Sequence, residues 1–210
     1  AAASFERALA FDAGYAMAHA GMAHARLAWF EASRADNQPA FEALDAAIAH
    51  AREATAHDEA LAEAHATLGV ALAGRGAWSE ALIEAQRAIT LEPGNWRHHV
   101  QFGHVSWGSA RIQAAERALT LNTACGRAFF QRATVVTARG DVRTAAQILE
   151  EGLGEIRRQS SERARVPGLE WLLGLIELAS GHSAAATAAF ERELALIDTN
   201  RPFGREYAMR

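Results

Sequence analysis

Lysine is missing from this chain of 210 residues, whose 21 basic side chains other than histidine are all arginine. A single cysteine, Cys125, excludes a disulfide bond within the chain. No run of about 18 apolar residues occurs, so no membrane-spanning helix is expected. The net charge of −4 and the pI of about 6.2 argue against general nucleic-acid binding, which normally needs a strongly basic face.

The usual patterns of catalytic and cofactor sites are also missing. The sequence has no Gly-rich phosphate loop, no nucleophile elbow and no His-Glu-x-x-His pattern. His98, His99 and His104 are close in sequence, but ligands spaced along one helix converge poorly on a metal ion, which favours packing or surface histidines. The sequence therefore predicts that the chain is not an enzyme and holds no metal or cofactor.

Proline is scarce, with 4 residues, and alanine is abundant. Alanine is the best helix former, and few stretches resemble β-branched strands. The composition therefore predicts an almost wholly α-helical protein.

Small and apolar residues recur with a period of about 34 residues, which is typical of stacked helix pairs. The clearest unit spans residues 62–95, and later copies begin near Gly126 and Pro167. Its characteristic residues are Leu68, Gly69, Gly76, Trp78, Ala81, Ala88, Leu91 and Pro93.

The period divides residues 1–210 into five units of one solenoid, with partial units at residues 1–15 and 201–210. The five units are 16–61, 62–95, 96–125, 126–166 and 167–200. The first unit exceeds the period by about 12 residues, so we expect longer helices on both sides of its loop. Because the chain begins and ends within a repeat, we expect the natural protein to continue at one or both ends.

The pattern also predicts several structural roles. Gly69 and Ala88 are expected where the two helices of a pair approach most closely, and Cys125 is expected to be a small apolar filler. Asp58 or Glu59 is expected to cap the helix that begins near residue 62. The tryptophans are expected in the core because their spacings follow the repeat, and they are Trp29, Trp78, Trp96, Trp107 and Trp171.

The stretch Ala62–Gly69, followed by Gly76–Ala81 and Ala88–Pro93, resembles the signature of tetratricopeptide (TPR) repeats, with His65 where tryptophan is common. The resemblance implies an all-α, right-handed α-solenoid of stacked antiparallel helix pairs. It also implies a protein-interaction scaffold that binds a partner protein or peptide in a concave groove.

A narrower similarity extends from Ala8–Ala16 through His19–Ala23 to Ala60–Gly69. These stretches resemble TPR modules of bacterial regulators that carry a winged-helix, adenylate cyclase or protein kinase domain. This similarity implies an alternative function, a ligand-sensing module that controls an attached effector domain.

Four positions of each first helix are expected to face the groove. They are Arg97, Val100, Gln101 and His104 in unit 96–125, and Arg127, Phe130, Gln131 and Thr134 in unit 126–166. An arginine four residues before a glutamine recurs, and such residues share a helix face. Guanidinium and amide groups bind carboxylates and peptide backbone, which predicts a site for an acidic or C-terminal peptide. Ordinary solvated groove residues are the alternative interpretation.

Charge is uneven along the chain. Residues 1–95 carry 13 acidic and 6 basic side chains, a net of −7, and residues 96–165 carry 6 and 11, a net of +5. This polarity predicts steering of a charged partner, or a homodimer formed through the solenoid ends, while unevenly charged solvated faces remain the alternative. We expect a cytoplasmic protein whose partners include neither nucleic acid nor a membrane.

Overall fold

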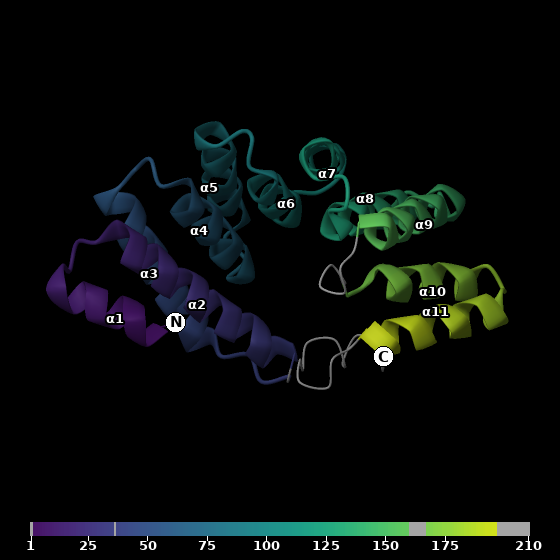
Figure 1. Cartoon of the computed structure of the whole chain (residues 1–210), viewed down its shortest axis with the longest axis horizontal. Helices are drawn as coiled ribbons and strands as arrows, with labels where there is room; N and C mark the ends of the chain where they lie inside the picture. The colour runs from purple at the N-terminus through teal and green to yellow at the C-terminus, as the bar shows by residue number, and fades with distance from the viewer. Residues whose placement is uncertain (1, 36, 160–166, 197–210) are drawn as a thin grey trace. The chain divides into compact units, whose positions relative to one another are not determined.

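The computed structural model describes residues 2–35, 37–159 and 167–196, which form eleven α-helices and no strand (Figure 1). The predicted all-α helical repeat is therefore confirmed. The helices are α1 (Ala2–Phe11), α2 (Ala16–Ala35), α3 (Phe41–His57), α4 (Ala62–Gly74), α5 (Trp78–Leu91), α6 (Trp96–Val105), α7 (Ser109–Leu121), α8 (Gly126–Ala138), α9 (Val142–Gln159), α10 (Leu169–Ala179) and α11 (Ser183–Leu196). The expected partial unit 201–210 lies outside the described residues.

The chain forms two compact units, Ala1–Ser106 and Trp107–Arg210. Their boundary falls between α6 and α7, within the expected unit 96–125, and the single array of residues 1–210 stays a prediction. In the first unit α2, α4 and α6 are the first, or A, helices of their pairs, and α3 and α5 are B helices. In the second unit α8 and α10 are A helices, and α9 and α11 are B helices.

The longer first pair is confirmed. Helices α2 and α3 have 20 and 17 residues, whereas α4 and α5 have 13 and 14. At a rise of about 1.5 Å per residue, α2 extends roughly 10 Å further than α4. The extra length carries the end of α2 and the start of α3 beyond the standard pair.

Close helix contact in the first unit depends on Gly69 of α4. A Cβ atom at this position would lie 2.9 Å from the carbonyl oxygen of Ala81 and 3.1 Å from the amide nitrogen of Ala85. The expected close approach at Gly69 is confirmed, and Ala88 is fully buried in the same helix pair.

Aromatic rings also lie against glycines where neighbouring helices meet. A Cβ atom added to any of these glycines would be less than 3.0 Å from the ring, so each aromatic side chain fills the space that the glycine leaves. The pairs are Phe5 with Gly21, Phe129 with Gly152, and Phe190 with Gly174.

A buried carboxylate joins α11 to the start of α10 in the second unit. Glu193 is fully buried, and its Oε1 accepts a hydrogen bond of 2.7 Å from the backbone N–H of Gly168. Its Oε2 accepts one of 3.2 Å from the N–H of Trp171. Burial raises the pKa of Glu193, although these hydrogen bonds act in the opposite direction. The carboxyl group thus satisfies backbone donors that the first turn of α10 leaves unpaired.

The prediction that all five tryptophans lie in the core is wrong for three of them. Trp29, Trp78 and Trp107 have exposed fractions of 59%, 55% and 58%. Trp78 is the first residue of α5, and Trp107 lies in the turn before α7, so both side chains are at helix ends. Their spacing along the sequence follows the repeat, but it does not indicate how far neighbouring helices cover each side chain.

The prediction that Asp58 or Glu59 caps α4 is also wrong. Leu61 occupies the N-cap position without a side-chain hydrogen bond. Asp58 Oδ1 instead accepts a 2.9 Å hydrogen bond from the N–H of Ala60 and closes the preceding turn. The same turn bond joins Asp12 with Gly14 and Asn122 with Ala124.

Candidate functional site

The predicted groove residues of α6 have different surroundings. Arg97 and His104 are exposed, whereas Val100 and Gln101 are half-buried. The guanidinium of Arg97 lies 4.7 Å from the ring centre of Trp96, which favours a cation–π contact. Arg97 and His104 are therefore the most exposed of these four residues.

The amide of Gln101 is already engaged within the first unit. Its Oε1 lies 3.1 Å from Nδ1 of the buried His98, whose Nε2 lies 3.0 Å from a carboxylate oxygen of Glu92. Hydrogen bonds from Asn95 and then from His98 lower the pKa of Glu92. A peptide backbone would have to compete with this network for Gln101.

The predicted residues of α8 belong to the second unit. Arg127 is exposed, and Phe130 is half-buried beside Gly168. Gln131 has an exposed fraction of only 4%, and its backbone carbonyl accepts a 2.8 Å hydrogen bond from the hydroxyl of the half-buried Thr134. The surface therefore presents Arg127 but not the Gln131 side chain, and the two Arg-x-x-x-Gln sets lie in different units.

A hollow of about 550 Å³ lies in the first unit, where the ends of α2 and α4 meet the first residues of α3 and α5. We call it the aromatic recess because aromatic side chains from three helices line it. Its lining residues are Phe30, Glu31, Arg34, Asn37, Pro39, Phe41, Val70, Ala73, Gly74, Trp78 and His104. Of the eight predicted site residues, His104 is the one that borders it, and ligand pockets commonly have volumes of this size.

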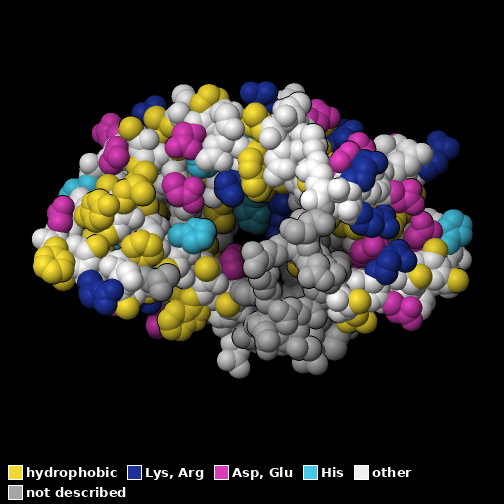
Figure 2. Space-filling view, viewed as in Figure 1, with side chains coloured by type: hydrophobic (Ala, Val, Ile, Leu, Met, Phe, Trp, Pro, Cys, Tyr) yellow, Lys and Arg dark blue, Asp and Glu magenta, His cyan; other side chains and the backbone are white. Residues whose placement is uncertain are grey.

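Phe30, Phe41 and Trp78 give the recess its aromatic character. Phe30 is buried with an exposed fraction of 2%, and its ring centre lies 5.7 Å from that of Phe41. Phe41 and Trp78 are 45% and 55% exposed and are the first residues of α3 and α5. Figure 2 shows hydrophobic side chains gathered on the surface over α1, α2 and α3.

Hydrogen bonds fix the loop that forms one side of the recess. The hydroxyl of Ser33 donates to the carbonyl of Phe30 at 2.7 Å and accepts from the N–H of Ala40 at 2.8 Å. The N–H of Gln38 donates to the carbonyl of Ser33 at 2.9 Å, and Asn37 adopts a positive φ of 57°. Ser33 thus links the end of α2 to both Gln38 and Ala40.

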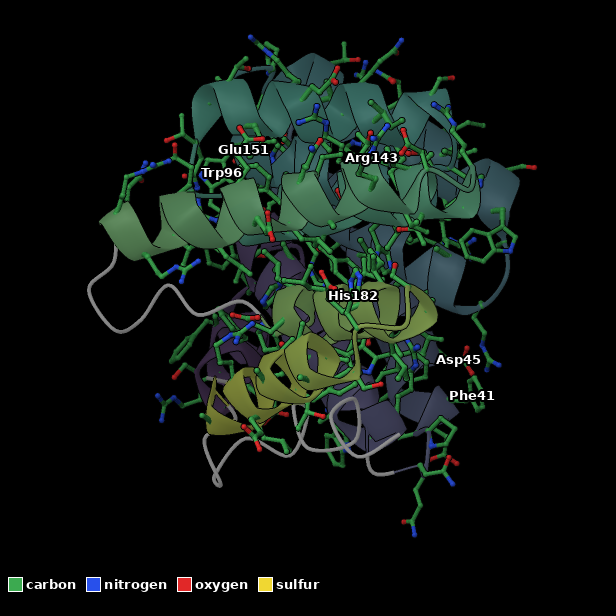
Figure 3. The ribbon with its side chains drawn as sticks, turned by 90° about the vertical axis from the view of Figure 1, so that its right-hand side faces the viewer. Phe41, Asp45, Trp96, Arg143, Glu151 and His182 are labelled. Atoms are coloured by element: carbon green, nitrogen blue, oxygen red, sulfur yellow. The ribbon has the colours of Figure 1, made fainter. Side chains whose placement is uncertain are left out.

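Ion pairs neutralise the arginines next to the recess. Arg34 Nη1 lies 3.1 Å from both carboxylate oxygens of Glu31, and Arg75 pairs with Asp45 through two N–H groups. Phe41 and Asp45 lie one turn apart at the start of α3 (Figure 3). The hydrogen bonds from Arg75 lower the pKa of Asp45, so this carboxylate stays ionised at neutral pH.

A second hollow, of about 400 Å³, lies among α3, α4 and α5 and is mainly charged. Arg52 forms a 2.9 Å ion pair with Glu80 across it, and His65 lies 2.6 Å from Glu84. The remaining lining residues are Thr55, Ala56, Glu59, Leu68 and Arg87. Its positive and negative groups mostly satisfy one another.

Three histidines occupy the same A-helix position in successive pairs of the first unit. In each ring Nε2 lies 2.9 to 3.1 Å from the carbonyl oxygen of the residue six positions earlier. The contacts are His19 with Ala13, His65 with Glu59, and His99 with Pro93. A carbonyl only accepts hydrogen bonds, so Nε2 carries the proton, and each ring ties its helix to the preceding turn.

The histidines and the cysteine do not form an obvious chemical centre. No three His, Cys, Asp or Glu side chains come together as a metal-binding group within the described parts of the chain. Cys125 is 4% exposed, and burial raises the pKa of its thiol, which disfavours the reactive thiolate.

Among the described helices, none combines the length and the apolar character that a membrane span requires.

The sequence reasoning missed the aromatic recess because its residues come from five helices and a loop. A usable signal was present in the excess length of unit 16–61. The aromatic residues Phe30 and Phe41 stand on either side of the inserted loop, and Trp78 begins the second helix of the next pair.

Neither a protein-family model nor a curated protein matches the sequence. Solved structures do match, at low identity. PilW, a type IV pilus biogenesis factor, is 18% identical with a TM-score of 0.69, and the match covers 97% of this chain and 87% of PilW.

Two further matches are TPR proteins. TTC0263 of Thermus thermophilus is 15% identical with a TM-score of 0.61, covering 85% of this chain and 96% of that one. YrrB, a TPR protein with an unusual peptide-binding site, is 15% identical with a TM-score of 0.52, covering 98% and 99%. The chain therefore has the TPR fold, a helical-repeat solenoid.

Proposed function

We propose that this chain is a protein-interaction module that binds a peptide segment of a partner protein on its A-helix face. The observation that carries the proposal is the aromatic recess. It is a concave site with aromatic surface open to solvent, and such sites commonly bind ligands. The TPR fold supports the proposal because stacked helix pairs provide extended binding surfaces.

The predicted residues Arg97, His104 and Arg127 are part of this proposal because they are exposed on A helices. We infer that each guanidinium group binds a carboxylate of the partner outside the recess. We also infer that residues 1–210 form one array of repeats.

We propose no catalytic role. The charged hollow gathers several titratable side chains, and two of its carboxylates are engaged. Glu80 is paired with Arg52, and Glu84 with His65. The alternative of a ligand-sensing module that controls an effector predicts that the chain retains a small molecule rather than a protein.

The test is affinity capture with the whole chain immobilised, followed by mass spectrometry. The variant Arg97→Glu/Arg127→Glu reverses two charges on A helices. The matched control Arg87→Glu/Arg143→Glu reverses two exposed charges on the B helices α5 and α9. We expect a specific protein to bind the native chain and the control but to be lost from the first variant.

Equal retention by both variants would exclude the arginine-bearing A-helix positions from the interface. If the native chain retains no protein above the level of an empty matrix, the interaction proposal fails. Circular dichroism of each variant must show unchanged helix content, because a misfolded variant would lose its partner for an unrelated reason.

A further inference from the structure

Phe41 and Trp78 leave an unusual amount of aromatic surface uncovered around the aromatic recess. Both begin B helices, both are about half exposed, and both line the recess together with the buried Phe30, whose ring centre lies 5.7 Å from that of Phe41. Burial of apolar surface stabilises a complex by about 25 cal/mol per Å², so an apolar group that covers these rings would bind favourably. Aromatic residues are also frequent among the energetically dominant residues of interfaces.

The charges around the recess indicate what such a group must be. Arg34 and Glu31 pair with each other at the recess, and Arg75 and Asp45 pair beside it. Arg75 also lies with its guanidinium carbon 5.0 Å from the ring centre of Phe41. These four side chains already pair with one another, so they offer a charged ligand no unpaired partner, whereas the rings of Phe41 and Trp78 are open to an apolar group.

Hydrogen bonds and close packing shape the recess. The Ser33 hydroxyl at the end of α2 accepts a hydrogen bond from the N–H of Ala40, and Gly74 lets α4 approach closely. A Cβ atom on Gly74 would lie 3.3 Å from the Leu44 methyl groups and 3.4 Å from the Phe30 ring.

We propose that the aromatic recess binds one uncharged aromatic or long aliphatic side chain, presented by a segment of a partner protein. The inference rests on the proposed interaction function and deepens it by naming the chemistry of the anchoring residue. The recess selects this residue by apolar contact with Phe30, Phe41 and Trp78. Charged residues of the partner contact other parts of the A-helix face.

The test uses the full chain and a positional-scanning library of short peptides blocked at both ends. We expect selection of Phe, Trp, Leu or Met at one position and exclusion of Asp, Glu, Lys and Arg there. Raising NaCl from about 50 to about 500 mM should hardly change the affinity of the selected peptide, since apolar contacts are not screened. Selection of a charged residue at that position, or no selection at all, overturns the proposal.

Matched substitutions locate the binding site. Trp78→Ala should weaken the selected peptide at least about tenfold, whereas Trp29→Ala should change its affinity by less than about twofold. Trp29 is a fair control because it belongs to the same unit, has nearly the same exposed fraction and does not line the recess. Phe41→Ala is a second, independent test in case Trp78→Ala disturbs the start of α5.

Fluorine NMR gives a readout that does not depend on loss of binding. The chain has five tryptophans, so incorporation of 5-fluorotryptophan gives five signals, which single Trp→Phe variants assign. We expect the selected peptide to shift the Trp78 signal and leave the Trp29 signal unchanged. A Trp78 signal that instead shifts with protein concentration alone assigns the recess to a second copy of the chain and overturns the proposal.

The two proposals can fail separately. If peptides bind with full affinity to Trp78→Ala and Phe41→Ala, the recess is not the anchor site, but the chain is still an interaction module. If affinity capture retains no protein, the interaction module itself is wrong. Apolar selectivity confined to the recess would then describe a small-molecule site.

Discussion

His65 Nδ1 lies 2.6 Å from a carboxylate oxygen of Glu84, so the ring joins helix α4 to helix α5. Its other nitrogen, Nε2, lies 3.1 Å from the carbonyl oxygen of Glu59 in the preceding turn. Both neighbours are hydrogen-bond acceptors, so each ring nitrogen of His65 faces an oxygen of another part of the unit. A single side chain at this position thus connects two helices and a turn.

Removal of this ring should destabilise the first unit. We expect His65→Ala to lower the free energy of unfolding by about 1.5–3 kcal/mol, because it removes hydrogen bonds to a charged group. Glu84→Gln keeps an oxygen acceptor for Nδ1 and should cost less. Urea unfolding followed by circular dichroism measures both, and an equal cost for the two variants would contradict a role for the His65 ring in joining the turn.

The pair His19–His50 should make stability depend on pH. Their Nδ1 atoms are 3.1 Å apart, and since His19 Nε2 donates to the carbonyl of Ala13, its Nδ1 accepts from His50. Burial, and then the charges of His19 and Arg26, lower the pKa of His50 from its ordinary value of 6.5, against the effect of Glu53.

A lowered folded-state pKa means that the unfolded chain takes up the proton first as the pH falls. The contribution of His50 is complete above its unfolded value of 6.5 and is lost as the pH falls toward the folded-state pKa. We expect His50→Asn to flatten the fall in urea midpoint between about pH 7.5 and about pH 5. If the urea midpoints of the native chain and of the variant fall in parallel with pH, His50 is not the source of the pH dependence.

Two glycine substitutions should have opposite signs. Gly69→Ala should destabilise the protein by about 1–3 kcal/mol, because its Cβ atom would lie 2.9 Å from the backbone oxygen of Ala81. Gly154 on α9 has no atom within 4 Å of an added Cβ, so Gly154→Ala should stabilise the protein by about 0.5–1 kcal/mol. Thermal unfolding of both variants, compared with the native chain, tests the prediction through the sign of each change.

Loss of the Glu193 carboxylate should weaken the α10–α11 pair. Glu193→Ala leaves the part-buried N–H groups of Gly168 and Trp171 without this acceptor, at a cost of about 1–3 kcal/mol. Because burial raises the pKa of Glu193, its contribution is complete below its ordinary value of 4.5 and falls as the pH rises through the folded-state pKa.

The destabilisation by Glu193→Ala should therefore be larger near about pH 5 than near about pH 8. Urea unfolding of the variant and of the native chain at both pH values measures the difference between their free energies of unfolding. The effects of the other titrating groups largely cancel in this difference. A larger cost at the higher pH would show that Glu193 acts mainly as an ionised carboxylate.

The sequence predicted those features that depend on local pattern. Periodic small residues correctly indicated stacked helix pairs, and the excess length of unit 16–61 correctly indicated longer helices. Burial was harder to predict because it depends on neighbours distant in sequence. Trp78 was expected inside and is exposed, and Gln131 was expected at the surface and has an exposed fraction of 4%.

The candidate site shows the same limit. His104 was named from its helix position and borders the aromatic recess, but Phe30 and Phe41 were not named because no repeat position predicts them. They come from the inserted length of the first pair, which a repeat pattern treats as an interruption. Tertiary contacts, rather than the period, bring them next to Trp78.

The three histidines that bond to the turn before their helix have a practical consequence. Helix-pair arrays need not unfold in one step, because each pair contacts mainly its neighbours, and a bulk signal then averages over different events. His19, His65 and His99 belong to successive helix pairs, and the ring of each is bonded to its own turn. Their imidazole proton resonances are therefore native reporters that can follow the melting of three neighbouring pairs individually, without any added label.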